Sequence, residues 1–230
     1  MNSKQKYAII VAGGSGKRMG NELPKQFIEV AGKPILMHTL MRFYEFDANT
    51  KIIVVLPESQ HSYWNELGLK YNFSIKHAVT KGGVERFFSV LNGLELIPKN
   101  ALVAVHDGVR PLVSIETISG CFEKAEEMGS AIPVIPATES IREVQQNTSK
   151  AVNRTNYVLV QTPQVFQSEI LIKAYQQEYE CNFTDDASVV EKAGYSIQLV
   201  KGNAENIKIT RPMDLKIAEV LLSEIQSNKE

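Results

Sequence analysis

Short apolar segments alternate with segments of helical periodicity along this chain, and this alternation constrains the fold more than any other feature of the sequence. The apolar segments are rich in Val, Ile and Ala, so they predict buried strands at residues 7–12, 51–56, 102–106 and 130–133. Apolar residues recur at the spacing of one helix face at Ile35, Leu36, Leu40 and Phe43; at Phe87, Leu91 and Leu94; at Ile115, Ile118, Phe122 and Ala125; and at Leu215, Ala218, Leu221, Leu222 and Ile225. The pattern predicts an α/β protein with a Rossmann-like, mostly parallel sheet and helices on both faces.

One stretch, residues 137–155, departs from this pattern because it is polar and holds few candidates for a core. Ile141 and Val144, with Val152, are placed to pair as two short strands. We therefore predict a protruding β-arm, inserted in a single domain that spans residues 1–230. A disordered surface loop is the alternative for this stretch.

Composition narrows the classes of function. A formal net charge of −1 gives no basic field for nucleic acid and no polybasic patch for a membrane. The apolar run at 7–12 is too short for a signal sequence or a membrane span. Cys121 and Cys181 show no metal-ligand spacing, and two reduced thiols suit a cytoplasmic protein. We expect a cytoplasmic protein whose phosphate-binding charge, if any, is local.

Glycines and cations are combined directly after the first predicted strand. The sequence there is AGGSGKRMG over residues 12–20, followed by PKQ over residues 24–26. Glycine lets backbone N–H groups approach a ligand closely, and this loop lies at the carboxyl end of the predicted sheet, where ligands bind. Lys17, Arg18 and Lys25 add positive charge, so the loop predicts a triphosphate site.

Two common phosphate-binding loops do not fit this segment. A Walker loop needs glycine at Val11 and a hydroxyl residue at Arg18, and a dinucleotide fingerprint needs glycine or alanine at Met19. A purely conformational role for the glycines is the alternative, and the cations Arg18 and Lys25 disfavour it.

Further motifs follow in collinear order from about residue 7 to residue 222. They are GGVER at 82–86 with SV at 89–90 and NG at 92–93, HDGVRP at 106–111, QTPQ at 161–164 with Phe166, TDDAS at 184–188 and NIKIT at 206–210. With the glycine loop, they resemble the sugar-phosphate nucleotidyltransferases and, among these, the methylerythritol phosphate cytidylyltransferases of non-mevalonate isoprenoid synthesis. The resemblance implies transfer of CMP from CTP to 2-C-methyl-D-erythritol 4-phosphate with release of pyrophosphate. It also implies Mg²⁺ bound with CTP, and a homodimer whose arms are exchanged.

The resemblance assigns roles to individual residues. The implied catalytic cations are Arg18, Lys25 and Lys208. Nucleotide binding is implied for Ala12, Gly13, Gly14, Ser15, Gly16, Gly82, Gly83, Ser89 and Asp107, with Asp107 also the implied ligand of Mg²⁺. Acceptor binding is implied for Arg110, Ser140, Arg154, Thr162, Thr184 and Asp186. From the residues alone, Lys208 as a surface lysine, Asp107 as a turn residue and Arg154 as a solvated charge remain open.

The sequence also departs from the family pattern and leaves rival functions open. Gly108-Val109 replaces a common pair of alanines, Ser140 replaces a threonine, and Asn153 replaces an aspartate. A ribitol phosphate cytidylyltransferase would share the glycine loop and QTPQ, whereas TDDAS and the NRTNYV segment at 153–158 favour methylerythritol phosphate. A non-catalytic nucleotide sensor on the same fold would be expected to lack a catalytic cation, and all three are present.

Overall fold

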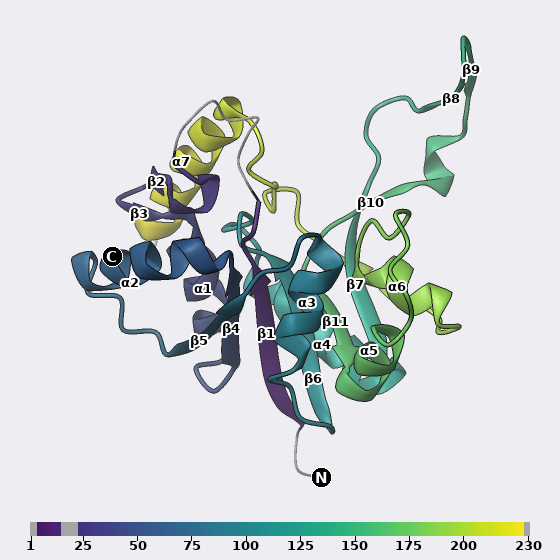
Figure 1. Ribbon diagram of the computed structural model, residues 1–230. Coiled ribbons are helices and arrows are strands. Elements are labelled where there is room, and N and C mark those ends of the chain that lie inside the picture. Colours follow the sequence, from purple (N-terminus) through teal and green to yellow (C-terminus); the bar gives the residue numbers. More distant parts are fainter. Residues whose placement is uncertain (1–3, 15–22, 228–230) are drawn as a thin grey trace.

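The computed structural model describes residues 4–14 and 23–227, and their core is one mixed β-sheet (Figure 1). Within these residues eight strands form the sheet, in the order β10-β7-β11-β6-β1-β4-β5, with β12 paired to β7. The strands are β1 (Gln5–Val11), β4 (Lys51–Leu56), β5 (His77–Lys81), β6 (Ala101–Asp107), β7 (Ser130–Pro136), β10 (Val158–Val160), β11 (Gln164–Gln167) and β12 (Leu199–Lys201). The pairs β1–β4, β1–β6, β4–β5 and β7–β12 are parallel. The predicted Rossmann-like, mostly parallel sheet is confirmed.

The unpredicted strands have a physical explanation. Each of the four predicted segments is a strand, and β7 runs on to Pro136. The edge strand β5 is only partly buried and the short strands β10 and β12 are mostly exposed, so none of them has the continuous apolar run that marks a buried strand. Strand β11 is buried but begins and ends with glutamine, and it runs antiparallel between β6 and β7.

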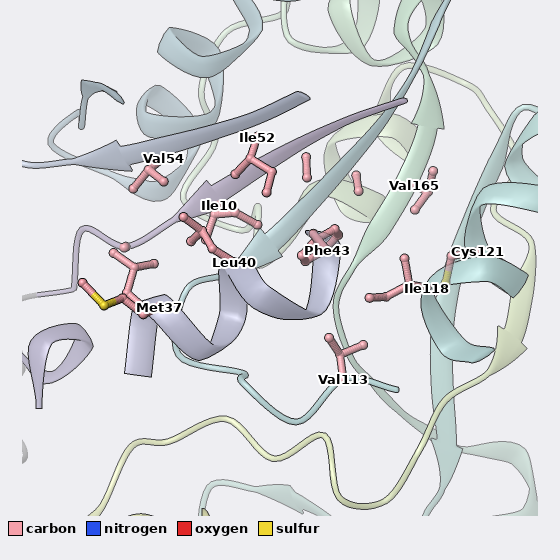
Figure 2. Close-up of a cluster of buried hydrophobic side chains, with 14 of the residues drawn as sticks. Ile10, Met37, Leu40, Phe43, Ile52, Val54, Val113, Ile118, Cys121 and Val165 are labelled. Carbon is pink, nitrogen blue, oxygen red and sulfur yellow. The ribbon is translucent and has the colours of Figure 1, made fainter. Parts of the chain in front are cut away.

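Helices cover both faces of the sheet. On one face lie α1 (Ile35–Phe46), α2 (His61–Lys70) and α4 (Ile115–Met128), and on the other lie α3 (Arg86–Leu94), α5 (Ser168–Ala174) and α6 (Asp186–Lys192). Successive strand side chains point to opposite faces, so Ile10 packs with α1 while Ile9 packs with α3 (Figure 2 shows the first of these cores). In the described part of the chain, no helix is long and apolar enough to cross a bilayer.

A third, smaller core fixes one side of the sheet's carboxyl edge. Helix α7 (Pro212–Ser227) packs on the hairpin of β2 (Glu29–Val30) and β3 (Lys33–Pro34), which follows the short 3-10 helix η2 (Lys25–Phe27). The Ile209 N–H donates to the Val109 carbonyl at 3.0 Å. This contact brings the segment before α7 to the end of β6. Elsewhere in the chain, the short 3-10 helix η3 (Glu58–Gln60) precedes α2.

The arm is a hairpin that projects away from the body (Figure 1). It consists of β8 (Arg142–Gln145) and β9 (Thr148–Ala151), followed by the 3-10 helix η4 (Arg154–Asn156). The predicted hairpin is confirmed, with Val144 opposite Ser149, and the Val152 N–H donates to the Ile141 carbonyl at 3.2 Å. Every residue of β8 and β9 is exposed, so the hairpin gains little from packing on its own chain.

Candidate active site

A first pocket of about 230 Å³ opens at the carboxyl ends of β1 and β6. Val11 and Asp107, the last residues of these parallel strands, are register partners, so the loops that follow them meet at one edge. Among the residues lining this pocket are the predicted Ala12, Gly13, Gly14, Lys25, Gly83, Ser89, Asp107 and Lys208. The fold thus brings together groups from five separate motifs of the sequence.

A second pocket of about 240 Å³ adjoins the first. It is lined by the predicted acceptor residues Arg110, Thr162 and Thr184, together with Gln161, Gln164 and Asp185. Arg86, Asp107 and Lys208 line both pockets and therefore form a wall that the two share. Two small ligands seated in these pockets would meet at that wall.

Asp107 holds the cations of the shared wall in place. Its Oδ2 accepts from Lys208 Nζ at 3.1 Å and from Arg110 Nε at 3.2 Å, and its Oδ1 lies 3.8 Å from Arg86 Nε. Burial alone would raise the pKa of the Asp107 carboxyl, but the three neighbouring cations outweigh burial and hold this pKa well below its usual range. Asp107 therefore stays ionised, and its charge concentrates three cations on one point between the pockets.

The Thr162 hydroxyl is oriented by a buried histidine. It accepts the Asp107 N–H at 3.1 Å and lies 3.1 Å from His106 Nδ1, while His106 Nε2 lies 3.1 Å from the Arg110 carbonyl. Burial lowers the pKa of His106 to about 4, so the ring is neutral. A carbonyl can only accept, so Nε2 carries the proton and Nδ1 accepts from Thr162. The Thr162 hydroxyl hydrogen is thus already used, and this group can only accept from a ligand.

The glycine pair after β5 serves packing as well as the pocket. A Cβ on Gly83 would lie 2.3 Å from Phe88 Cβ, so glycine is required where this turn packs on α3. The Gly83 N–H donates to Ser89 Oγ at 3.0 Å, and that hydroxyl donates to the Glu85 carbonyl at 3.2 Å. The Gly82 N–H donates a hydrogen bond to the Leu56 carbonyl, and Gly82 does not line the first pocket. On the opposite wall, a Cβ on Gly14 would press on Lys25 Cε at 3.3 Å.

Several predicted residues lie elsewhere. Ser15, Gly16 and Arg18 lie outside the described residues. Ser140 and Arg154 are exposed on the arm and line neither pocket; the Arg154 guanidinium donates to the Thr138 carbonyl within the arm.

Asp186 is fully buried, and both of its carboxylate oxygens accept from Arg86. It is therefore joined to the pockets through Arg86 and does not line them itself.

Sequence reasoning gave no individual role to Arg86, although it lines both pockets. It follows the glycine pair within the GGVER motif and begins the helix predicted from Phe87, Leu91 and Leu94. A cation in the first turn of a helix is unfavourable because the helix dipole is positive at that end. The position of Arg86 was therefore the available signal in the sequence that this arginine has a role other than stabilising the helix.

Comparison with known proteins identifies the family. The family model of IspD, 2-C-methyl-D-erythritol 4-phosphate cytidylyltransferase, matches residues 7–224. A 2-C-methyl-D-erythritol 4-phosphate cytidylyltransferase from Phocaeicola vulgatus is 54% identical over 217 residues, which cover 94% of this chain and 99% of that protein. One from Porphyromonas gingivalis is 54% identical over 222 residues, which cover 96% and 99%.

Solved structures agree with the sequence comparison. The 2-C-methyl-D-erythritol 4-phosphate cytidylyltransferase of Francisella tularensis superposes with a TM-score of 0.79 at 34% identity, covering 95% of this chain and all of that one. The 4-diphosphocytidyl-2C-methyl-D-erythritol synthase of Anaerococcus prevotii superposes with a TM-score of 0.81 at 25% identity, covering 96% and 100%. With its motifs in order and its two pockets joined at a cationic wall, the chain belongs to the 2-C-methyl-D-erythritol 4-phosphate cytidylyltransferase family.

Proposed function

We propose that this chain transfers the cytidylyl group of CTP to 2-C-methyl-D-erythritol 4-phosphate and releases pyrophosphate. Membership of the family supports this assignment. The observation that carries it is the wall of Arg86, Asp107 and Lys208 between the two pockets. CTP occupies the first pocket and the sugar-alcohol phosphate the second, so their phosphates meet at the cations.

The reaction is an in-line displacement at phosphorus. An oxygen of the acceptor phosphate forms a bond to the α-phosphorus of CTP, and the bond from that phosphorus to the bridging oxygen of pyrophosphate breaks. The acceptor oxygen is already anionic at neutral pH, so the step needs positioning and charge stabilisation more than a strong base. The main obstacle is the approach of one polyanion to another.

Cations of the chain offset that repulsion. Lys25 lines the first pocket and Lys208 the shared wall, and both stabilise charge on the α-phosphate and the leaving group. Arg18 joins them in this proposal. The Gly13 and Gly14 backbone and Ser89 face the nucleotide, with Gly82, Ser15 and Gly16 completing that set.

The second pocket suits the acceptor. Arg110 Nε and Nη1 are held by Asp107 and by the Asn206 carbonyl, which fixes the plane of a group suited to phosphate. Thr162 can accept from an acceptor hydroxyl, and Thr184 lines the same pocket. Asp186 serves this site by orienting Arg86.

We also propose that Mg²⁺ binds together with CTP. Among residues 4–14 and 23–227, no group of three or more His, Cys, Asp or Glu side chains is arranged to hold a metal ion. Asp107 fits as a single carboxylate ligand, because Mg²⁺ commonly combines one carboxylate with phosphate oxygens and water. Its Oδ1, whose nearest cation is 3.8 Å away, is the more available oxygen. When bound, the ion would neutralise charge on the triphosphate.

A homodimer with exchanged arms completes the proposal. The hairpin is exposed along its whole length, and the strand that follows it carries the exposed apolar residues Val158, Leu159 and Val160. A two-fold partner would cover this strand and receive the arm, which would present Ser140 and Arg154 to the partner's acceptor.

We place the enzyme in the cytoplasm. Cys121 is buried, Cys181 is exposed, and both are free thiols. Free cysteines are the usual state in a reducing compartment.

The test is an acceptor screen at fixed CTP and Mg²⁺ with pyrophosphate release as the readout. We expect 2-C-methyl-D-erythritol 4-phosphate to give the highest kcat/KM, and CTP to be preferred to UTP, ATP and GTP. A higher kcat/KM with ribitol 5-phosphate would reassign the acceptor. Binding of CTP without pyrophosphate release from any acceptor would point to a nucleotide sensor.

A further inference from the structure

Arg86 lines both pockets, and a buried carboxylate holds its guanidinium. Its Nη1 and Nη2 donate to the two oxygens of Asp186 at 2.9 and 2.7 Å, and its Nε lies 3.8 Å from Asp107 Oδ1. The two hydrogen bonds to Asp186 therefore fix the plane of the guanidinium, and Asp107 adds only a longer charge contact.

Asp186, the carboxylate partner of Arg86, is itself held in place. Asp186 is fully buried at the first position of α6, and its Oδ1 also accepts from the Tyr175 hydroxyl at 2.6 Å. The Tyr175 ring stacks on Phe87, the neighbour of Arg86, with ring centroids 4.7 Å apart. Tyr175 thus contacts Asp186 through its hydroxyl and the chain neighbour of Arg86 through its ring.

Stability alone is a weak reason for such a pair. The desolvation penalty of a buried ion pair can exceed its Coulombic gain, and apolar replacements are often as stable. Phe87 already stacks on Tyr175, directly after α5, and on Phe183, shortly before α6. A charged pair at this place is better explained by what its exposed part can bind.

Part of Arg86 remains available to ligands. A guanidinium has five N–H donors, and Asp186 takes one from each terminal nitrogen. A second N–H therefore remains on each of these nitrogens, and 28% of the side chain is exposed. This exposed part belongs to the wall shared by the two pockets.

We infer that Arg86 is a catalytic residue that donates hydrogen bonds to a phosphate of each substrate across the shared wall, and that Asp186 and Tyr175 position it. The inference rests on the two-substrate reaction proposed above. It gives Asp186 a positioning role in place of direct contact with the acceptor. The arginine also offsets the repulsion between the two phosphates as they approach.

The main test compares single and double variants. Arg86→Gln should lower kcat/KM by about 10²-fold, because a preorganised cation at the reacting phosphates is lost. Arg86→Lys should retain part of the activity, since lysine keeps the positive charge but lacks the planar, bidentate donor geometry of a guanidinium. Asp186→Asn should lower kcat/KM by a smaller factor in the wild type and should add nothing to Arg86→Gln, because its effect passes through Arg86.

The double variant also guards against misfolding. Arg86→Gln alone leaves Asp186 buried without its partner, whereas the double variant removes both charges and should keep the fold. The control is Arg42→Gln, which breaks an ion pair to Glu45 at 2.7 Å and a hydrogen bond to the Val113 carbonyl. Arg42 lines neither pocket. The kcat/KM of this variant should stay within about threefold of wild type, as expected of a substitution away from the active site.

A rescue experiment separates contact with substrate from a structural role. Added guanidinium, at concentrations well below those that unfold the wild type, should raise the kcat of Arg86→Ala and leave that of Arg42→Gln unchanged. Wild-type turnover of CTP and acceptor tests the proposed function itself, so failure of the inference is distinguishable from failure of that function. The inference is overturned if folded Arg86→Gln, or the folded double variant, turns over within about threefold of an active wild type, since a catalytic cation contributes far more.

Discussion

Lys208 Nζ lies 3.1 Å from Asp107 Oδ2, so the proposed catalytic lysine is held at the end of β6 by a buried carboxylate. The two residues are 101 positions apart in the sequence, in the motifs HDGVRP and NIKIT. Asp107 also holds Arg110 and faces Arg86, so it acts as a common anchor for the wall between the pockets.

Replacing Lys208 should impair chemistry more than folding. In Lys208→Met, Asp107 keeps Arg86 and Arg110 as partners, and we expect kcat to fall by about 10²-fold with little change in the free energy of unfolding. Steady-state kinetics and urea unfolding would measure the two effects. Lys201→Met, at an exposed site that lines neither pocket, is the matched control. Unchanged kcat in Lys208→Met would remove Lys208 from the catalytic set.

Lys25 should behave as a group that acts on the transition state. It lines the first pocket from η2, with its Nζ 3.5 Å from the Ile209 carbonyl. We expect Lys25→Ala to stay folded and to lose roughly 10²-fold or more in kcat. If only the KM for CTP rises while kcat is kept, Lys25 contributes to binding alone.

The Thr162 hydroxyl should matter to both stability and acceptor binding. Thr162→Val leaves the Asp107 N–H and His106 Nδ1 without their partner, and each buried unsatisfied group costs about 1–3 kcal/mol. We expect a lower free energy of unfolding and a higher KM for the acceptor, whereas Thr162→Ser should preserve both. A Thr162→Val protein as stable as wild type would contradict the hydrogen-bond network.

Acid should destabilise the protein partly through His106. Its pKa is lowered by burial to about 4, below that of an unfolded histidine, so the unfolded state binds the proton first as the pH falls. Its contribution to stability is present above about pH 6.5 and is lost toward pH 4, amounting to about 3 kcal/mol.

Urea unfolding of wild type and His106→Asn at pH 7 and pH 4 would measure this loss. The variant should lose less stability over that interval, although it is less stable at pH 7. Equal losses in the two proteins would show that His106 does not titrate in this way.

The arm can be tested by complementation. Lys25→Ala and Arg154→Ala chains should each be inactive alone, and together they should form mixed dimers. With exchanged arms, one site of each mixed dimer combines both unaltered residues, and random pairing restores roughly a quarter of wild-type sites. Mixed dimers confirmed by separable tags but without activity would show that Arg154 serves its own chain.

Much of the architecture could be predicted from local patterns. The four apolar runs became strands because a strand buried on both faces needs a continuous apolar sequence, which is visible without any partner. The arm was visible for the opposite reason, since a stretch without core candidates cannot pack on its own domain. The meeting of the glycine loop and Asp107 at one crevice follows from parallel strands β1 and β6 ending at one edge.

Pairings between distant segments were decided only by the tertiary structure. Nothing near Asp186 in the sequence shows that it lies under Arg86, 100 positions away, because that contact depends on how α3 and α6 pack on the sheet. The sequence likewise does not show that β11 pairs with both β6 and β7 and runs antiparallel to them, because these pairings depend on the tertiary structure. The sequence by itself determined which residues are apolar, charged or free to turn, since these are properties of each side chain. Packing determined which charged groups face each other. The energy of interaction between two charges depends on their separation and burial, and both are defined only in the folded chain.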